Sequence, residues 1–138
     1  MTLICGVDEA GRGPLCGPVF ASAVILDDNL KIKNLGDSKK ISPKKRKEIY
    51  EEIKINAFEY TFAAASVEEI DKLNILNASL LAMKRAILML SKRPDKCFVD
   101  GIYTPKIVGC NLTAIIKGDT LFPSISAASI VAKVERDK

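Results

Sequence analysis

Short runs of apolar residues alternate with polar, glycine-rich or proline-rich segments along the chain. The first two runs cover residues 3–7 and 19–26, and the second of them is rich in valine, isoleucine and alanine. Glycine and proline recur between these runs, where they favour turns over continuous regular structure. The pattern therefore predicts two strands that are joined by a shaped loop.

Helical periodicity begins after the second run. Ser42 and Pro43 suit the start of a helix, because a hydroxyl group can cap the first turn and proline fits within it. Ile49 and Ile53 lie four residues apart. This spacing predicts an amphipathic helix over residues 44–54.

Two further helices are predicted in the middle of the chain. Ser66 is followed three residues later by Glu69, which is the pattern of a capping box at the start of a short helix. Residues 75–90 then carry apolar side chains over much of a helix circumference. This helix is therefore expected to pack between the sheet and other helices.

The remaining apolar runs complete the predicted fold. Residues 58–65, 97–99 and 112–116 are strand candidates. Ser124 or Ser126 is expected to cap a last helix toward the C-terminus. The element order β-β-α-β-α-α-β-β-α predicts an α/β fold, in which a mixed five-stranded sheet has helices on both faces.

The composition agrees with one folded domain over residues 1–138. Apolar residues make up 48% of the chain and charged residues 28%, which is an ordinary globular balance. The net charge of +4 is compatible with a polyanionic partner but is too common to identify one. The sequence shows neither a signal peptide nor a membrane-spanning run, so a cytoplasmic location without membrane association is expected.

The absence of histidine removes several mechanisms. A Ser-His-Asp or Cys-His nucleophile system cannot be built from a chain with no histidine. The four cysteines form no Cys-x-x-Cys pair, which disfavours a structural zinc site. Acid–base or metal chemistry must therefore come from carboxylates, lysine, tyrosine or cysteine.

Carboxylates follow two of the predicted strands. Asp8 and Glu9 come at the end of the first apolar run, and they are expected to converge only if the strand stops or bulges there. Asp100 ends a buried strand in the same way, and Asp137 lies on the last predicted helix. These four side chains meet at one edge of the sheet if the helix and strands pack as predicted.

A cluster of carboxylates calls for a cation, because the charges repel one another and their burial is costly. Hard oxygen ligands suit Mg²⁺ or Mn²⁺, and a pair of such ions can activate water and stabilise the leaving oxygen of a phosphodiester. A simpler interpretation stays open at this point. An Asp-Gly pair often marks only a turn, and an Arg-Asp pair at a helix end is often just solvated.

Several segments stand out in order along the chain. They are VDEAGRGPLCGPV (7–19), DSKK (37–40), SPKKR (42–46), DG (100–101), KGD (117–119) and AASIVAKVERD (127–137). Together they resemble the conserved blocks of the ribonuclease HII family, and they cover nearly the whole chain. No single block is sufficient, but the set is highly specific. The form of the first block favours HII over the related ribonuclease HIII.

The resemblance implies a ribonuclease H-like fold with an active site of four acidic residues, which are Asp8, Glu9, Asp100 and Asp137. It implies hydrolysis by a water molecule that Mg²⁺ or Mn²⁺ activates, leaving a 3′-hydroxyl and a 5′-phosphate. The implied partners are RNA·DNA hybrids and duplex DNA that contains a ribonucleotide. The family cuts such DNA on the 5′ side of the ribonucleotide.

The resemblance also implies substrate contacts. Gly11, Arg12 and Gly13 match the loop with which the family senses the 2′-hydroxyl group, and glycine lets backbone amides approach a ligand closely. Lys39 and Arg46 match positions that are expected to contact phosphate. For Arg12, bracing of the loop is the alternative to substrate contact.

Members of the family continue well beyond the Arg-Asp pair, and they carry a tyrosine there that stacks beside the junction sugar. Tyr50, Tyr60 and Tyr103 do not occupy that motif, so none inherits the role. We therefore expect a chain that lacks the family's C-terminal segment. A monomer is also expected. A catalytically impaired core that only binds hybrids is one alternative function, and a resolvase-like phosphotransferase is another.

Overall fold

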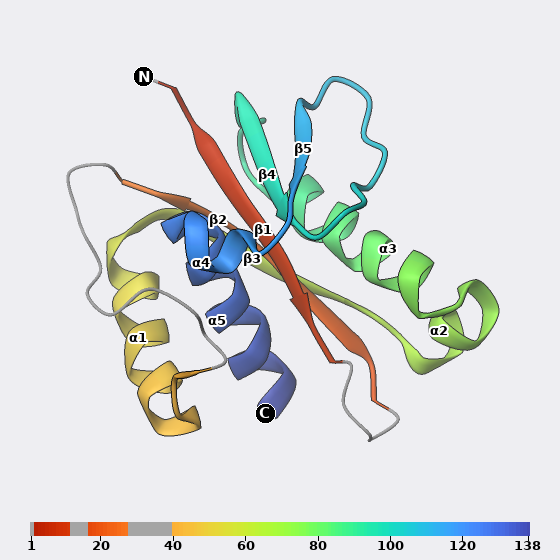
Figure 1. The fold of residues 1–138 in the computed structure, drawn as a ribbon, viewed down its shortest axis with the longest axis horizontal. Helices are drawn as coiled ribbons and strands as arrows, with labels where there is room; N and C mark the ends of the chain where they lie inside the picture. Colours follow the sequence, from red (N-terminus) through yellow and green to blue (C-terminus); the bar gives the residue numbers. More distant parts are fainter. Residues whose placement is uncertain (1, 12–16, 28–39) are drawn as a thin grey trace.

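The computed structural model describes residues 2–11, 17–27 and 40–138, which are arranged around a central β-sheet (Figure 1). The strands are β1 (Ile4–Ala10), β2 (Val19–Leu26), β3 (Ala57–Ala65), β4 (Lys96–Asp100) and β5 (Leu112–Ile115). The helices are α1 (Pro43–Asn56), α2 (Val67–Leu73), α3 (Ile75–Leu88), α4 (Gly118–Leu121) and α5 (Pro123–Asp137). None of the helices in these ranges is long and apolar enough to cross a lipid bilayer.

The strand order within the described residues is β3-β2-β1-β4-β5. β1 pairs with β2 and β2 with β3 in an antiparallel manner, whereas β1, β4 and β5 run parallel. Figure 1 shows α1 and α5 on one side of the sheet and α2 and α3 on the other. The predicted mixed five-stranded sheet with helices on both faces is therefore confirmed.

Small side chains let α3 lie close against the sheet. Ala78, Ala82 and Ala86 recur every four residues of α3, and all three are fully buried in a core that includes β1, β2 and β4. On the opposite face, the core contains Val131 of α5 and Ile53 of α1. The helical spacing that predicted these elements thus marks the helix faces that are buried.

β1 passes so close to the start of α5 that Gly6 has no room for a side chain. A Cβ atom on Gly6 would collide with the backbone of Ser124 and Ile125. We predict that Gly6→Ala lowers the free energy of unfolding by about 3 kcal/mol, because neither backbone segment can move without shifting the helix. Chemical denaturation measures the change. Gly17→Ala is the matched control, since a Cβ atom there meets no described atom within 4 Å. Equal stability of the two variants would contradict the close approach.

The predicted starts of α1 and α2 are confirmed. Ser42 Oγ accepts a hydrogen bond from the Lys45 amide at 3.2 Å. At the start of α2, the Glu69 amide donates to Ser66 Oγ at 3.1 Å, and the Ser66 amide donates to Glu69 Oε1 at 3.0 Å. These bonds complete the predicted capping box and satisfy amides that a helix start leaves without partners.

The predicted cap of α5 is wrong. Its N-cap is Phe122, and Pro123 is the first helical residue. Proline fits this position because its ring fixes φ near the helical value and the first turn does not need its missing N–H. Ser124 and Ser126 consequently lie inside the helix, where both are buried. The Ser126 amide donates to the Phe122 carbonyl at 3.0 Å.

An ion pair between α2 and α3 makes folding stability depend on pH. Arg85 donates to the Glu69 carboxylate from both terminal nitrogens, at 2.7 and 2.5 Å. These bonds lower the pKa of Glu69 from its usual 4.5 to about 2. Because the folded pKa lies below the unfolded one, the pair stabilises the fold above pH 4.5, and this contribution is lost as the pH falls to about 2.

We predict that Glu69→Gln lowers stability at neutral pH, and that its difference from the wild-type protein disappears as the pH falls through this window. Urea unfolding at a series of pH values measures the difference. Glu68→Gln removes a second carboxylate from the same turn of α2, and it is the control for the loss of a negative charge as such. A constant difference for Glu69→Gln at all pH values would show that the ion pair does not carry the effect.

Candidate active site

Carboxylates gather where β1 and β4 part. The parallel ladder between these strands ends at the pair of Val7 and Val99. Asp8 and Asp100 are the next residues of the two strands, and the carboxyl ends of parallel strands lie at a common edge of the sheet. The structure accordingly brings Asp8 and Asp100 into one pocket.

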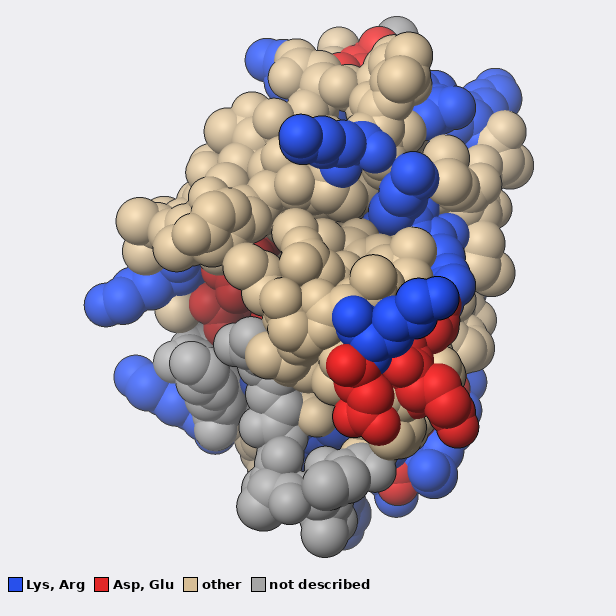
Figure 2. Space-filling view, turned by 90° about the vertical axis from the view of Figure 1, so that its right-hand side faces the viewer, with Lys and Arg blue, Asp and Glu red and all other residues tan. Residues whose placement is uncertain are grey.

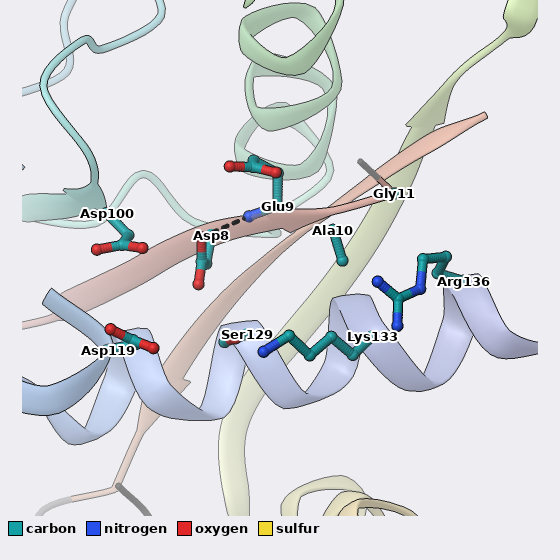
Figure 3. Close-up of a pocket in the computed structure, with 9 residues that line it drawn as sticks. All are labelled: Asp8, Glu9, Ala10, Gly11, Asp100, Asp119, Ser129, Lys133 and Arg136. Atoms are coloured by element: carbon teal, nitrogen blue, oxygen red, sulfur yellow. Dashed lines mark hydrogen bonds between the residues drawn. The ribbon is translucent and has the colours of Figure 1, made fainter. Parts of the chain in front are cut away.

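β1 neither stops nor bulges at its carboxylates, contrary to the prediction. It pairs with β2 without interruption as far as Ala10, with Asp8 opposite Ser22 and Glu9 opposite Ala21. Neighbouring side chains on a regular strand point to opposite faces. Figure 3 shows Asp8 directed toward α5 and Glu9 toward α3. Both still line the pocket, because β4 no longer pairs with β1 at this level.

The pocket has a volume of about 400 Å³ and opens between the end of β1 and α5 (Figure 3). Side chains from β1, the end of β4, α4 and α5 meet there. The described residues that line it are Asp8, Glu9, Ala10, Gly11, Asp100, Asp119, Ser129, Lys133 and Arg136. Carboxylates and cations both belong to this set, so the pocket suits a ligand that carries several charges.

Asp119 is a pocket residue to which the sequence prediction gave no role. Lys117 adopts a left-handed conformation with a φ of 56°, and α4 begins at the next residue. The Gly118 amide donates to Asp100 Oδ1 at 2.7 Å, and a Cβ atom on Gly118 would collide with the side chain of Ile125. This tight turn places Asp119 in the same pocket as Asp100. The Lys-Gly-Asp segment was a visible signal, but strand and helix periodicity do not distinguish its acid from a surface turn residue.

Asp137 departs from the prediction, because it is not one of the described residues that line the pocket. The face of α5 that lines the pocket carries Ser129, Lys133 and Arg136 (Figure 3). Asp137 follows Arg136 by one residue, which turns its side chain by about 100° around the helix axis. There it forms ion pairs with Arg46 at 3.6 Å and with Arg136 at 3.0 Å.

Arg46 is occupied by structural partners. Its Nη1 donates to the Ile41 carbonyl at 2.9 Å, and its Nη2 lies 3.6 Å from Asp137 Oδ2. The side chain is only 11% exposed. These contacts tie the start of α1 to the end of α5. Phosphate binding by Arg46 stays a prediction, and the geometry favours a bracing role.

Of the predicted loop residues, Gly11 lies within the described part of the chain. It lines the pocket with a φ of 130°, a conformation that favours glycine. A Cβ atom on Gly11 would come within 2.8 Å of the Pro18 carbonyl oxygen. Arg12, Gly13 and Lys39 lie outside the described residues, so their predicted contacts with the substrate stay predictions.

Burial makes the Asp8 carboxylate costly to ionise. Asp8 is only 5% exposed. Its burial raises the pKa of that carboxyl well above the usual value, and the charges of Asp100 and Glu9 raise it further. Hydrogen bonds from the Glu9 amide, at 2.8 Å, and from Ser129 oppose this shift. Burial also lowers the pKa of Lys133. A cation bound beside the carboxylates would relieve their repulsion.

The donor atoms of the pocket suit Mg²⁺ or Mn²⁺. Carboxylate oxygens are hard ligands, and β1, β4 and α4 all supply them. Among the described residues, no three His, Cys, Asp or Glu side chains form a group that could hold a metal ion as they stand. Mg²⁺, however, usually keeps several waters and binds through one or two carboxylates. The residues therefore fit a hydrated divalent cation.

The chain matches known proteins over nearly its whole length. The family model for ribonuclease HII matches residues 5–138. A ribonuclease HII of Burkholderia pseudomallei (strain 668) is 55% identical over 136 residues, which are 99% of this chain and 63% of that protein. A ribonuclease HII of Coxiella burnetii (strain Dugway 5J108-111) is 56% identical over 136 residues, which are 99% of this chain and 67% of that protein.

The crystal structure of the ribonuclease H2 from Pyrococcus horikoshii OT3 aligns with a TM-score of 0.84 and 28% identity, over 99% of this chain and 72% of that chain. The predicted ribonuclease H-like fold is therefore confirmed. Within this class, the chain belongs to the ribonuclease HII family. It spans between 63% and 67% of the length of these two curated relatives.

Proposed function

We propose that the chain is a metal-dependent endonuclease that cuts the RNA strand of RNA·DNA hybrids and nicks duplex DNA on the 5′ side of an embedded ribonucleotide. The observation that carries the proposal is the pocket in which Asp8, Glu9, Asp100 and Asp119 come together. Membership of the ribonuclease HII family supports this substrate class. A cytoplasmic location and a monomeric state stay predictions.

The positions of five pocket residues support a proposed role for each of them. Asp8 and Asp100, which follow the last paired residues of adjacent parallel strands, would hold a hydrated divalent cation, and Glu9 and Asp119 would complete its surroundings. When bound, Mg²⁺ or Mn²⁺ supplies a water of lowered pKa and neutralises charge on the phosphodiester. Lys133 extends from α5 along the same pocket (Figure 3), where its ammonium group can attract a phosphate oxygen.

Diffuse surface charge does not explain how a substrate would be positioned. Figure 2 shows lysine and arginine side chains spread over one face, and a cluster of acidic side chains below its centre. Both signs of charge thus occupy the face, so specific contacts near the pocket must set the register of the substrate.

Cleavage of a labelled duplex that contains one ribonucleotide tests the proposal, with Mg²⁺, Mn²⁺ or a chelator present. We expect a nick on the 5′ side of the ribonucleotide that requires metal, and we expect a hybrid duplex to be cut along its RNA strand. An all-DNA duplex is the control. Cleavage of that duplex would indicate a resolvase-like activity instead. Tight binding without cleavage would leave the chain as a hybrid-binding core.

A further inference from the structure

Another pocket opens on the α3 side of the sheet, and we call it the α3 pocket. Its volume of about 350 Å³ lies within the usual range of roughly 300–1,000 Å³ for ligand pockets. Glu9 and Asp100 line both this pocket and the candidate active site. A ligand whose phosphate lies at the carboxylates can therefore extend from one pocket into the other.

The rest of the α3 pocket is largely apolar. Leu76, Leu80 and Met83 line it, and their spacing of four and three residues places them on one face of α3. Ile102 and Tyr103 join them from the segment that follows β4. Tyr103 is 53% exposed and Ile102 is 65% exposed, so both present apolar surface that a ligand can cover.

A glycine turn brings these exposed side chains to the candidate active site. Gly101 has a φ of 122° directly after Asp100, a conformation that favours glycine. Its amide still donates to the Ile115 carbonyl at 3.0 Å, so the turn is anchored to β5. Ile102 and Tyr103 follow immediately. An aromatic ring thus lines the α3 pocket only three residues after a candidate metal ligand.

We propose that the α3 pocket binds the nucleoside next to the phosphate that lies at the carboxylates, with Tyr103 packed against its base or sugar. This inference rests on the proposed function, because it needs a nucleic-acid phosphate at the carboxylate pocket. Aromatic side chains stack on every base with little regard to sequence. The apolar side chains that form the rest of the α3 pocket disfavour a phosphate there. The uncharged part of the nucleotide is therefore the part that fits.

Binding measurements on Tyr103 variants test this inference without relying on cleavage. Fluorescence anisotropy of a duplex with one ribonucleotide gives the Kd, with Ca²⁺ in place of Mg²⁺ and gels to check that the strands stay intact. Tyr103→Ala removes the ring and is expected to raise the Kd about 5- to 100-fold. Tyr103→Phe keeps the ring and is expected to stay within about twofold of the wild-type protein. Leu88→Ala is the matched control, because Leu88 is an exposed residue of α3 that is not among the described residues lining the pocket.

Modified substrates identify the group that Tyr103 contacts. The nucleotide on either side of the cleavable phosphate is replaced by tetrahydrofuran, which lacks the base, or by a propanediol spacer, which also lacks the sugar ring. A Tyr103→Ala defect that disappears on tetrahydrofuran assigns the contact to the base. A defect that disappears only on the spacer assigns it to the sugar. Both results support the inference. A defect that persists on the spacer at both positions overturns it.

Failure of this inference is distinguishable from failure of the proposed function. A wild-type protein that binds and cuts the duplex, together with a Tyr103→Ala variant that binds equally well, refutes the nucleoside site alone. A wild-type protein that neither binds nor cuts refutes the proposed function, and the inference falls with it. If Tyr103→Ala instead dissociates a dimer in sedimentation experiments, the α3 pocket is an interface between copies of the chain and the inference is overturned.

Discussion

Asp8→Asn is expected to slow metal-dependent cleavage severely and, without metal, to make the protein harder to unfold. A cation contributes several kcal/mol to the transition state, so loss of this ligand slows cleavage on the order of 10³-fold. The same carboxylate opposes folding when no metal is bound, because burial and its acidic neighbours raise its pKa well above the usual 3.8. Asparagine keeps the oxygen that accepts from the Glu9 amide but carries no charge. We therefore expect Tm to rise by a few degrees.

The stability gained in Asp8→Asn is expected to depend on pH. Because the folded pKa of Asp8 lies above its unfolded value, the wild-type protein bears the full penalty at a pH above the folded pKa. The penalty shrinks as the pH falls from the folded pKa toward 3.8, and it is absent below 3.8, where the carboxyl group is protonated in both states. Asparagine does not titrate. The difference in Tm between Asp8→Asn and the wild-type protein should therefore narrow over the same pH range.

Thermal melts in chelator and in Mn²⁺, together with the single-ribonucleotide cleavage assay, measure these effects. Mn²⁺ should raise the Tm of the wild-type protein and leave that of Asp8→Asn nearly unchanged, because a ligand stabilises the state that binds it. Asp71→Asn is the control, since it removes an exposed acid of α2 that does not belong to the described pocket lining. A variant that cuts as well as the wild-type protein, or that melts below it in chelator, contradicts the proposed role of Asp8.

The positions of Asp8 and Asp100 could be predicted from the sequence, because each of them follows an apolar run that forms a buried strand. An apolar run precedes each of them, and the two strands are parallel neighbours whose carboxyl ends share one edge of the sheet. The capping residue Ser66 was predictable for a similar reason, since its hydrogen bonds depend only on residues within one helical turn.

Other parts of the site depend on backbone geometry that the spacing of apolar and polar residues in the sequence does not reveal. Asp8 and Glu9 point to opposite faces of a regular strand, and they share a pocket only because β4 stops pairing with β1 just before them. The left-handed conformation of Lys117 gives Asp119 its place. A non-glycine residue with positive φ is uncommon, and residue spacing does not reveal it.

The rotation of α5 was also beyond the reach of the sequence. Periodicity predicted a helix there, but it did not say which of its polar residues would face β1. That choice follows from a tertiary contact, because Gly6 of β1 lies directly against the backbone of Ser124 in the first turn. With the helix held in this way, Lys133 lines the pocket and Asp137 pairs with Arg46 instead.

Asp119→Asn and Asp137→Asn are therefore expected to have very different effects on cleavage. Asp119 is 9% exposed and shares the pocket with Asp100, so its loss is expected to slow cleavage about 10²- to 10³-fold. Asp137 is 36% exposed and pairs with Arg46. Its replacement is expected to keep the cleavage rate within about fivefold of the wild-type protein and to cost at most about 1 kcal/mol of stability.

Nicking rates at saturating Mg²⁺ show which of the two acids is needed for cleavage. Urea unfolding of each variant measures the accompanying change in stability. Each substitution removes one negative charge and conserves the shape of the side chain, so each variant serves as the control for the other. A severe cleavage defect in Asp137→Asn would make that residue a metal ligand. It would also require α5 to rotate by about 100° away from its contact with Gly6. A normal rate in Asp119→Asn would instead mean that Asp8, Glu9 and Asp100 hold the cation without a fourth carboxylate.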